Sequence, residues 1–404
     1  MRVHTELRLP YSTIDAQDNG PRLNASGVAF GETRQQRLRV AHDRVRAAVH
    51  ATASALLLSV LTIGPTAAQD TTSARPTMRA DGTIPMRAYD LPISRFLTPP
   101  AREAFIQWTR RTEGAMKGCP TRADTEEKAL AMRRCVNELF APLLAKQKAR
   151  YDVRIESDTI GGIYAEVFTP AGGVSRQNQG RVLINVHGGG FILGARTISQ
   201  IEAIPIAAAG KIKVVSVDYR MGPEHKFPAA SQDVAAVYRE ILKRYNPKNV
   251  GIYGCSAGGV LTAQALSWFQ KEGLPMPGAA GMFCAAASYW DEGDSGYFIN
   301  GSPAPPNENP YLRDADFKDP LVFPINAPEV LAKFPPSLLV VSTRDFALSS
   351  VVHTHSELVK HGVAAELHVW EGLGHAFFMD PDFPQSREMY EVTVKFFDRH
   401  LGRD

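Results

Sequence analysis

The sequence predicts an α/β fold with a mostly parallel central sheet and helices on both faces. From about residue 150 onward, strand-like apolar runs alternate with helix-like ones, which is the pattern of parallel strands joined by crossover helices. Two glycine-rich turns, each directly after a strand-like run, are the second observation. A chain of 404 residues, 44% hydrophobic and 22% charged, can bury the core that such a fold needs.

The order of the elements also predicts how the sheet begins. The runs 152–156 and 162–168 are short and close together, so we expect an antiparallel leading edge. We find no internal repeat, dinucleotide fingerprint, phosphate loop or Cys/His cluster with metal-ligand spacing, and we therefore expect no cofactor and no metal. Helices are expected over 198–209, 232–245, 260–271, 351–361 and 386–401.

The glycine-rich turn at residues 254–259 has the form G-x-S-x-G, with Ser256 at its centre. An apolar run, 250–253, precedes it, and a helix-like segment begins at Val260. A serine at such a strand-to-helix turn is held in a strained conformation and exposed, and only small neighbours permit the bend. The pattern indicates a nucleophile.

The other glycine-rich turn, residues 187–191, reads His-Gly-Gly-Gly-Phe and follows the strand-like run 181–186. Its glycines let backbone N–H groups point at one place without interference from Cβ atoms, as an oxyanion hole requires. A nucleophile turn and a donor turn together predict acyl transfer, most simply ester hydrolysis.

A serine nucleophile needs a base and an acid, and both have candidates after late strands. Asp345 ends the segment 342–345 that follows the strand-like run 337–341, and His375 follows a second run that begins at Glu366. The order serine, acid, histidine is that of α/β-hydrolases. His375 would take the Ser256 proton, and Asp345 would fix the tautomer of the imidazole.

Each assignment has an alternative. Glu371 is the closest rival acid, although it belongs to the loop that carries His375. His368 lies inside a strand run and is expected to be structural. The acidic residues 291–294 follow another strand but come too early in the chain.

The stretch 218–230, DYRMGPEHKFPAA, resembles the D-Y-R-L-A-P-E-H-x-F-P-A-A signature of the hormone-sensitive-lipase-like (bacterial family IV) esterases. The H-G-G-G and G-x-S-A-G-G turns fit the same family, and segments 342–345 and 366–372 are more similar to its acetyl esterase and ε-lactone hydrolase branch. The resemblance covers about residues 150–401. It implies an α/β-hydrolase fold with an N-terminal helical cap and serine esterase activity. Carried over by position, the triad is Ser256, Asp345 and His375, and the oxyanion donors are the N–H groups of Gly189, Gly190 and Ala257.

The signature stretch has a physical interpretation of its own. Pro223 and Pro228 stiffen a loop that cannot be regular structure. Arg220 and Glu224 need partners there, and we expect them to pair with each other or to brace the His187 turn. His187 is expected to anchor the donor loop by hydrogen bonds.

The N-terminal part has a different composition. Residues 1–68 hold eight arginines and five acidic residues, which accounts for the net charge of +3. The remainder is neutral, and a nucleic-acid partner, which needs a concentrated basic surface, is not expected. Arg44 and Arg46 precede an apolar stretch, 51–63, and small residues that end at Ala68. This is the pattern of a signal peptide cleaved after Ala68, and its apolar run is too short to span a bilayer.

The position of that signal implies where the protein is found. Because this pattern starts some 40 residues into the chain, we expect a downstream biological start, at a valine such as Val40 or Val45. Cleavage of the signal peptide would then give a secreted or periplasmic enzyme that begins near Gln69. The alternative is a cytoplasmic protein with a polar extension followed by an apolar cap segment. N-terminal sequencing of the protein expressed from its native gene would decide between them.

Residues 69–150 are expected to form the cap, and 151–404 the catalytic domain. Helical periodicity covers 101–114 and 125–148. Cys119 and Cys135 either pair in an oxidising compartment or remain free thiols. We expect the substrate pocket to be lined by four residues that adjoin the catalytic loops, Phe191, Tyr289, Trp290 and Phe377. Because a cap lies over the strand ends, some of Leu91, Phe96, Leu97 and Trp108 are further candidates.

These features predict a serine esterase acting on small-molecule esters of short or medium chain length. The alternatives are a lactonase or another specialised hydrolase with the same triad, and a non-catalytic α/β-hydrolase that binds small molecules. Edge strands or the last helix would suit a homodimer, but nothing in the sequence demonstrates one.

Overall fold

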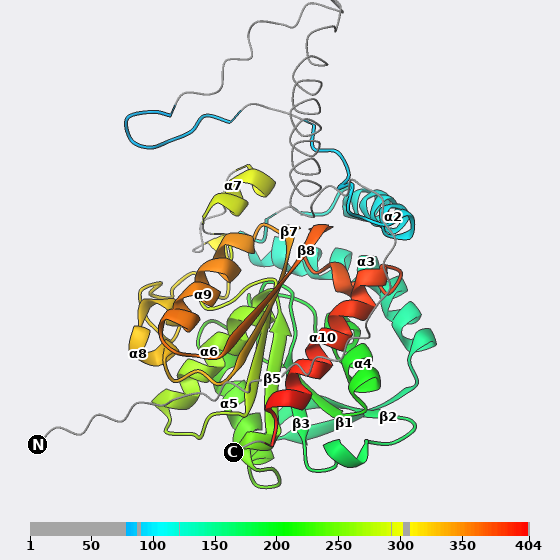
Figure 1. Ribbon diagram of the computed structural model, residues 1–404, viewed down its shortest axis with the longest axis vertical. Helices are drawn as coiled ribbons and strands as arrows, with labels where there is room; N and C mark the ends of the chain where they lie inside the picture. The colour runs from blue at the N-terminus through cyan, green and yellow to red at the C-terminus, as the bar shows by residue number, and fades with distance from the viewer. Residues whose placement is uncertain (1–77, 87–89, 121, 292, 302–307, 403–404) are drawn as a thin grey trace, which may run out of the picture. The chain divides into compact units, whose positions relative to one another are not determined.

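The computed structural model describes residues 78–86, 90–120, 122–291, 293–301 and 308–402 (Figure 1). The predicted polar extension and signal peptide, with its apolar stretch 51–63 and cleavage after Ala68, lie outside these residues. The chain divides into two units, 1–89 and 90–404. In the first, the described residues 78–86 form a turn in which the Arg79 N–H donates to the Thr83 carbonyl. Everything below concerns the second.

An eight-stranded sheet forms the centre of the second unit, in the order β1-β2-β4-β3-β5-β6-β7-β8. β1 and β2 pair antiparallel, β2 is antiparallel to β4, and the remaining neighbours are parallel, so the predicted antiparallel leading edge is confirmed. The strands are β1 Val153–Ile160, β2 Ile163–Pro170, β3 Val182–Val186, β4 Lys213–Val217, β5 Val250–Cys255, β6 Ala279–Phe283, β7 Ser337–Arg344 and β8 Ala365–Gly374.

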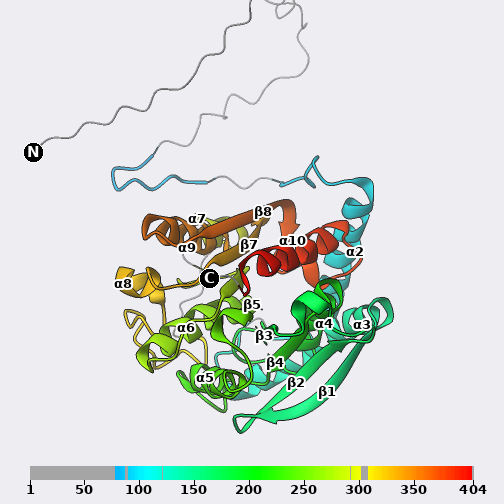
Figure 2. The same ribbon diagram turned by 60° about the horizontal axis from the view of Figure 1, so that its bottom comes forward.

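Helices cover both faces of the sheet (Figures 1 and 2). Side chains alternate along β3: Val182 and Ile184 join the core under α5 and α6, whereas Leu183 joins the core under α4 and α10. The five predicted helices are all present, with ends shifted by at most four residues. The helices of this part are α4 Ile198–Gly210, α5 Ala229–Ile241, α6 Ala257–Lys271, α7 Asp294–Asn300, α8 Pro328–Leu331, α9 Leu348–Lys360 and α10 Pro384–His400.

The segment before β1 is helical, as the sequence predicts. α2 (Pro99–Met116) packs on α3 (Glu126–Arg150), and the rings of Trp108 and Phe140 meet edge to face with centroids 6.0 Å apart. The structure pairs Cys119 with Cys135 in a disulfide, which joins the α2–α3 loop to α3. Among the described residues, no helix is long and apolar enough to cross a membrane.

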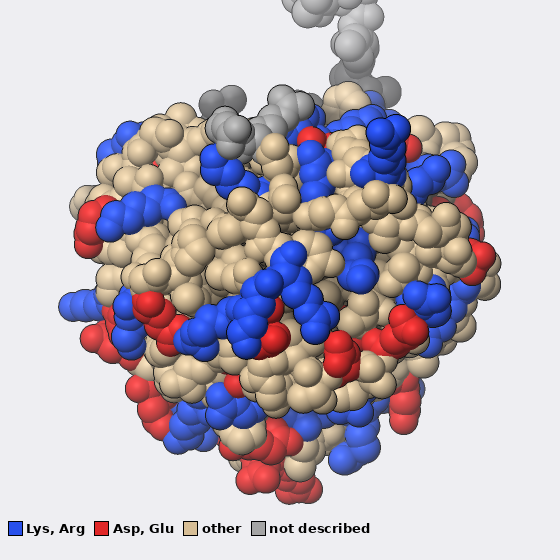
Figure 3. All heavy atoms as spheres, turned by 90° about the horizontal axis from the view of Figure 1, so that it is seen from below, with Lys and Arg blue, Asp and Glu red and all other residues tan. Residues whose placement is uncertain are grey.

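The topology reverses beside β3, because β4 lies on one side of that strand and β5 on the other. In open α/β sheets, ligands bind beyond the carboxyl ends of the strands at such a point. Both glycine-rich turns leave these strand ends, since residue 187 follows β3 and Ser256 follows β5. On the face shown in Figure 3, basic and acidic side chains lie among uncharged areas.

Candidate active site

Ser256 occupies the sharp turn between β5 and α6. Its φ of 58° and ψ of −125° place it in a strained region for a residue with a side chain. The turn is possible because its neighbours are glycines: a Cβ on Gly254 or Gly258 would lie 2.1 or 1.9 Å from the Val186 carbonyl oxygen. The strand-to-helix geometry therefore presents the serine hydroxyl at the carboxyl edge of the sheet.

The structure brings the three predicted triad residues together. His375 Nε2 lies 2.9 Å from Ser256 Oγ, and His375 Nδ1 lies 2.8 Å from Asp345 Oδ1. Asp345 is fully buried just after β7, whereas the His375 side chain, after β8, is 26% exposed. The rival acid Glu371 instead accepts a hydrogen bond from Ser94 Oγ at 2.8 Å. The arrangement can pass a proton from serine to histidine.

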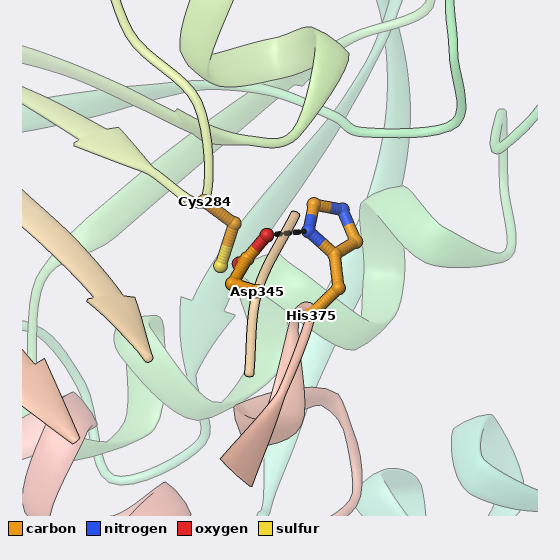
Figure 4. A group of neighbouring side chains, drawn as sticks. All are labelled: Cys284, Asp345 and His375. Carbon is orange, nitrogen blue, oxygen red and sulfur yellow. Dashed lines mark hydrogen bonds and ion pairs between the residues drawn. The ribbon is translucent and has the colours of Figure 1, made fainter. Parts of the chain in front are cut away.

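Cys284, a buried free thiol, is a further neighbour of the triad. Its Sγ lies within 4.8 Å of a carboxylate oxygen of Asp345 and a ring nitrogen of His375, and Figure 4 shows the thiol facing the carboxylate. Burial raises the pKa of the Cys284 thiol. Because both nitrogens of His375 are engaged by Asp345 and Ser256, these residues do not form a free set of metal ligands. The position of Cys284 directly after β6 was the available signal for its place at the site.

The loop of residues 187–190 has the backbone geometry of a donor turn. Gly189 and Gly190 have φ angles of 115° and 61°, and a Cβ on Gly189 would lie 2.2 Å from the Leu193 carbonyl oxygen. Asn309 Nδ2 donates to the Gly190 carbonyl at 2.8 Å, which fixes the far end of the loop. Within the described residues, the N–H groups of Gly189, Gly190 and Ala257 donate to no protein acceptor, so they are available for a ligand.

His187 anchors this loop through contacts of its ring and of its main-chain carbonyl. Its ring stacks on Tyr219 with centroids 4.4 Å apart, its Nδ1 lies 2.8 Å from the Gly188 carbonyl, and the Tyr219 hydroxyl donates to the His187 carbonyl at 2.7 Å. Complete burial lowers the pKa of His187, which keeps the ring neutral. The ring therefore acts as an anchor, as expected.

The expected partners of Arg220 and Glu224 were wrong. Arg220 forms a bidentate ion pair with Asp233 of α5, at 2.7 to 3.0 Å. Glu224 pairs at 2.8 Å with Arg133 of α3, whose guanidinium also donates to the Ile192 carbonyl. Because Arg133 lies on α3, its ion pair with Glu224 joins this loop to the helical segment before β1.

A cavity of about 720 Å³ opens onto Ser256 and His375. Most of its wall is apolar and comes from α2, α3 and the loops after the strands. Its lining comprises Trp108, Thr112, Met116, Pro120, Arg122, Ala123, Met132, Val136, Leu139, Phe140, Gly190, Ile192, Ser256, Tyr289, Trp290, Glu308, Asn309, Pro310, Phe346, His375 and Ala376.

Of the four cap candidates, Trp108 lies in this wall, whereas Leu91, Phe96 and Leu97 are not among the lining residues. Two of the four other predicted pocket residues, Tyr289 and Trp290, lie in this wall as well. Phe191 and Phe377 do not, which corrects the prediction. Phe191 has a φ of 61° and turns its ring into the core, where it stacks on Tyr311 at 4.8 Å. Phe377 is buried against Trp370, with ring centroids 5.4 Å apart.

The fold and this site define an α/β-hydrolase. Residues 183–379 match the family model described as alpha/beta hydrolase fold. An acetyl-hydrolase of Streptomyces hygroscopicus is 27% identical over 253 residues, covering 60% of this chain and 82% of that protein. An arylesterase of Saccharolobus solfataricus is 27% identical over 279 residues, covering 65% and 87%.

Solved structures of esterases share this fold. The crystal structure of esterase E25 superposes with a TM-score of 0.70 at 27% identity, covering 79% of this chain and 99% of that one. An esterase of the bacterial hormone-sensitive lipase family shares the fold, with a TM-score of 0.65, 23% identity and coverage of 76% and 99%. With the motifs of the catalytic loops, these matches show an α/β-hydrolase that is similar in sequence to esterases and acetyl-hydrolases and shares the fold of a hormone-sensitive-lipase-family esterase.

Proposed function

We propose that the protein hydrolyses carboxylic esters of short to medium chain length through an acyl-enzyme at Ser256. The observation that carries the proposal is the hydrogen-bonded chain from Ser256 through His375 to Asp345 at the foot of an apolar cavity. The relatives with esterase and acetyl-hydrolase names support the same reaction class.

In the acylation step, Ser256 Oγ attacks the ester carbonyl carbon while His375 Nε2 takes its proton. The negative charge that develops on the carbonyl oxygen is met by the N–H groups of Gly189, Gly190 and Ala257. The tetrahedral intermediate that this attack forms then collapses. The bond from the carbonyl carbon to the alcohol oxygen breaks, and the alcohol leaves with the proton from His375. Water then repeats the sequence at the acyl-enzyme, releasing the acid and restoring Ser256.

The cavity supports a neutral substrate. Its wall is made largely of aromatic, methionine and aliphatic side chains from α2 and α3. Among the described lining residues, Arg122 is the only lysine or arginine, and it forms an ion pair with Glu308 at 3.2 Å. An apolar acyl or alcohol group therefore fits better than a charged one.

Hydrolysis of p-nitrophenyl esters from acetate to palmitate, beside Ser256→Ala and a simple lactone, tests the proposal. We expect an optimum at short or medium chain length that Ser256→Ala abolishes. Faster turnover of the lactone would make the protein a lactonase with the same triad. A folded wild-type protein that turns over none of these compounds would overturn the proposal and favour a binding role.

We also propose that the enzyme is exported. The disulfide between Cys119 and Cys135 supports this, because such bonds persist in oxidising compartments, and the leader-like pattern before Gln69 agrees with it. N-terminal sequencing of the protein made from its native gene is expected to give a start near Gln69 in the periplasm or medium. A cytoplasmic product that retains the upstream residues would contradict export.

A further inference from the structure

Behind the donor loop, a buried carboxyl group binds the backbone of its first glycine. Glu202 of α4 is 4% exposed, and its Oε1 accepts the Gly188 N–H at 2.9 Å. It is the only charged residue in the sequence of α4, which is otherwise dominated by apolar residues. A lone acid in an apolar helix was the signal that the sequence offered for it, since such a group needs a specific reason to be buried.

A short polar chain holds Glu202 in place. Asn185 Nδ2, from β3, donates to Glu202 Oε2 at 2.9 Å, and Ser216 Oγ, from β4, donates to Asn185 Oδ1 at 2.7 Å. Each oxygen of the carboxyl group therefore has a partner. The chain ties the donor loop to two central strands.

The same carboxyl group lies close to the nucleophile turn. A Cβ placed on Gly188 would lie 3.2 Å from Glu202 Oε1 and 3.4 Å from Ser256 Cβ, so both groups approach one point of the loop. The N–H groups of Gly189 and Gly190 follow directly in the chain. A change in the Gly188 contact is therefore transmitted to the donors without any intervening flexible segment.

We propose that Glu202 is a positioning residue for ester hydrolysis, which holds Gly188 and thereby directs the N–H groups of Gly189 and Gly190 toward the oxyanion. The proposal rests on the function proposed above for Ser256. Glu202 touches no substrate; it acts through the backbone of the loop.

The charge of Glu202 then affects the reaction. Burial raises its pKa to about 8, partly offset by the hydrogen bonds from Asn185 and Gly188, so the group is neutral at pH 7. A protonated Glu202 is compatible with this polar chain. When the Asn185 amide is turned over, its Oδ1 accepts the Glu202 O–H and its Nδ2 donates to Ser216 Oγ. Above pH 8 a carboxylate behind the loop opposes the negative charge of the oxyanion.

The titratable groups around Glu202 do not share this change. Tyr253, whose hydroxyl donates to the Glu202 main-chain carbonyl at 3.4 Å, and Tyr219 have pKa values raised well above their ordinary value by burial. Burial also raises the pKa of Cys255 and lowers that of His187, so both stay neutral. Tyr390 of α10 has its pKa raised by burial as well. Glu202 is the group of this cluster that titrates near pH 8.

The test compares the pH profile of kcat and KM, measured by pH-stat on ethyl butyrate from pH 6 to 9.5, in Glu202→Gln and Glu202→Leu. Wild type should lose about tenfold in kcat between pH 7 and 9.5. Glu202→Gln keeps an acceptor for Gly188, so it should retain most of the kcat at pH 7 and lose this alkaline decrease. Glu202→Leu should lower kcat about 100-fold with little change in KM.

A matched control is available on β2, where Glu166 contacts the same helix, α4. Glu166 is 8% exposed, accepts from Gln200 of α4 at 2.7 Å, and has a pKa raised by burial, yet it does not contact the donor loop. Glu166→Gln should therefore leave the alkaline decrease unchanged. The same alkaline decrease in Glu202→Gln as in wild type would overturn the proposal, and this comparison decides the matter if Glu202→Leu fails to fold. Activity retained by Ser256→Ala would instead overturn the proposed function.

Discussion

His375 and Asp345 are joined through one carboxylate oxygen. Asp345 Oδ1 lies 2.8 Å from His375 Nδ1 and also accepts the Ala347 N–H at 2.9 Å, whereas the buried Oδ2 has no hydrogen-bond partner. The orientation of the imidazole therefore depends on a single acceptor atom. The environment of Asp345 is consistent with an acid that holds the histidine in one tautomer.

Asp345→Asn tests this dependence. The amide can place its NH2 group against His375 Nδ1, which reverses the tautomer of the ring, or it can leave the NH2 group buried and unpaired at the Oδ2 position. In either orientation the negative charge that stabilises the imidazolium is lost. We expect kcat on p-nitrophenyl butyrate to fall by about 10³ to 10⁴, with KM little changed. Steady-state kinetics at pH 7 measure both constants.

Glu371 provides the matched control for that experiment, since it lies in β8 shortly before His375 and hydrogen-bonds Ser94 at 2.8 Å. Glu371→Gln should keep kcat within a few-fold of wild type. If Glu371→Gln were the more damaged variant, the acid of the triad would have to be reassigned to Glu371.

The triad could be predicted from the sequence because each member is defined by its place after a strand. Ser256, Asp345 and His375 follow β5, β7 and β8, and the carboxyl ends of parallel strands meet at one edge of the sheet. The order of the strands therefore places these three residues, which are far apart in sequence, at one site. The same reasoning predicts the layers of the fold and the antiparallel leading edge.

The pocket and the ion pairs could not be predicted in this way. The direction of the Phe191 side chain depends on its positive φ, and Phe377 packs on Trp370 rather than toward Ser256. Adjacency to a catalytic loop does not determine which way a ring points. Likewise, the Arg133 partner of Glu224 comes from a cap helix 91 residues away in sequence, and no local pattern encodes such a contact.

The disulfide should contribute to the stability of the cap. It joins Cys119 and Cys135 across a separation of 16 residues, and the double variant Cys119→Ser/Cys135→Ser should lose about 3 kcal/mol in free energy of unfolding. Urea denaturation of wild type and variant, each with and without reductant, measures this. Reductant should weaken wild type only; equal denaturation midpoints in wild type with and without reductant would contradict the bond's contribution.

The apolar wall of the cavity should set the chain length of the substrate. Val136 of α3 lines this wall, so Val136→Trp should fill part of it and lower kcat/KM for p-nitrophenyl octanoate at least about tenfold, with acetate little affected. Val359→Trp adds the same volume at a 52% exposed position of α9 and serves as control. An equal loss on both esters in Val136→Trp would indicate damage to the fold or triad rather than a shortened pocket.

Glu202 should also make stability depend on pH in a specific direction. Its pKa is about 8 in the folded protein against an ordinary value of 4.5, so between these values the folded state holds a proton that the unfolded state has released. Stability is therefore lost as the pH rises through this window, by up to about 1.4 kcal/mol per pH unit.

Glu202→Gln removes that proton and with it the slope. We expect Glu202→Gln to gain stability relative to wild type as the pH rises from 5 to 8, measured by urea denaturation at each pH. Glu138→Gln, at an exposed position of α3, corrects for the loss of one negative charge. Parallel pH curves for wild type and Glu202→Gln would mean that Glu202 is already ionised in the folded protein. Gly188 would then be bound by a carboxylate at neutral pH, and the charge behind the donor loop would be constant rather than titrating.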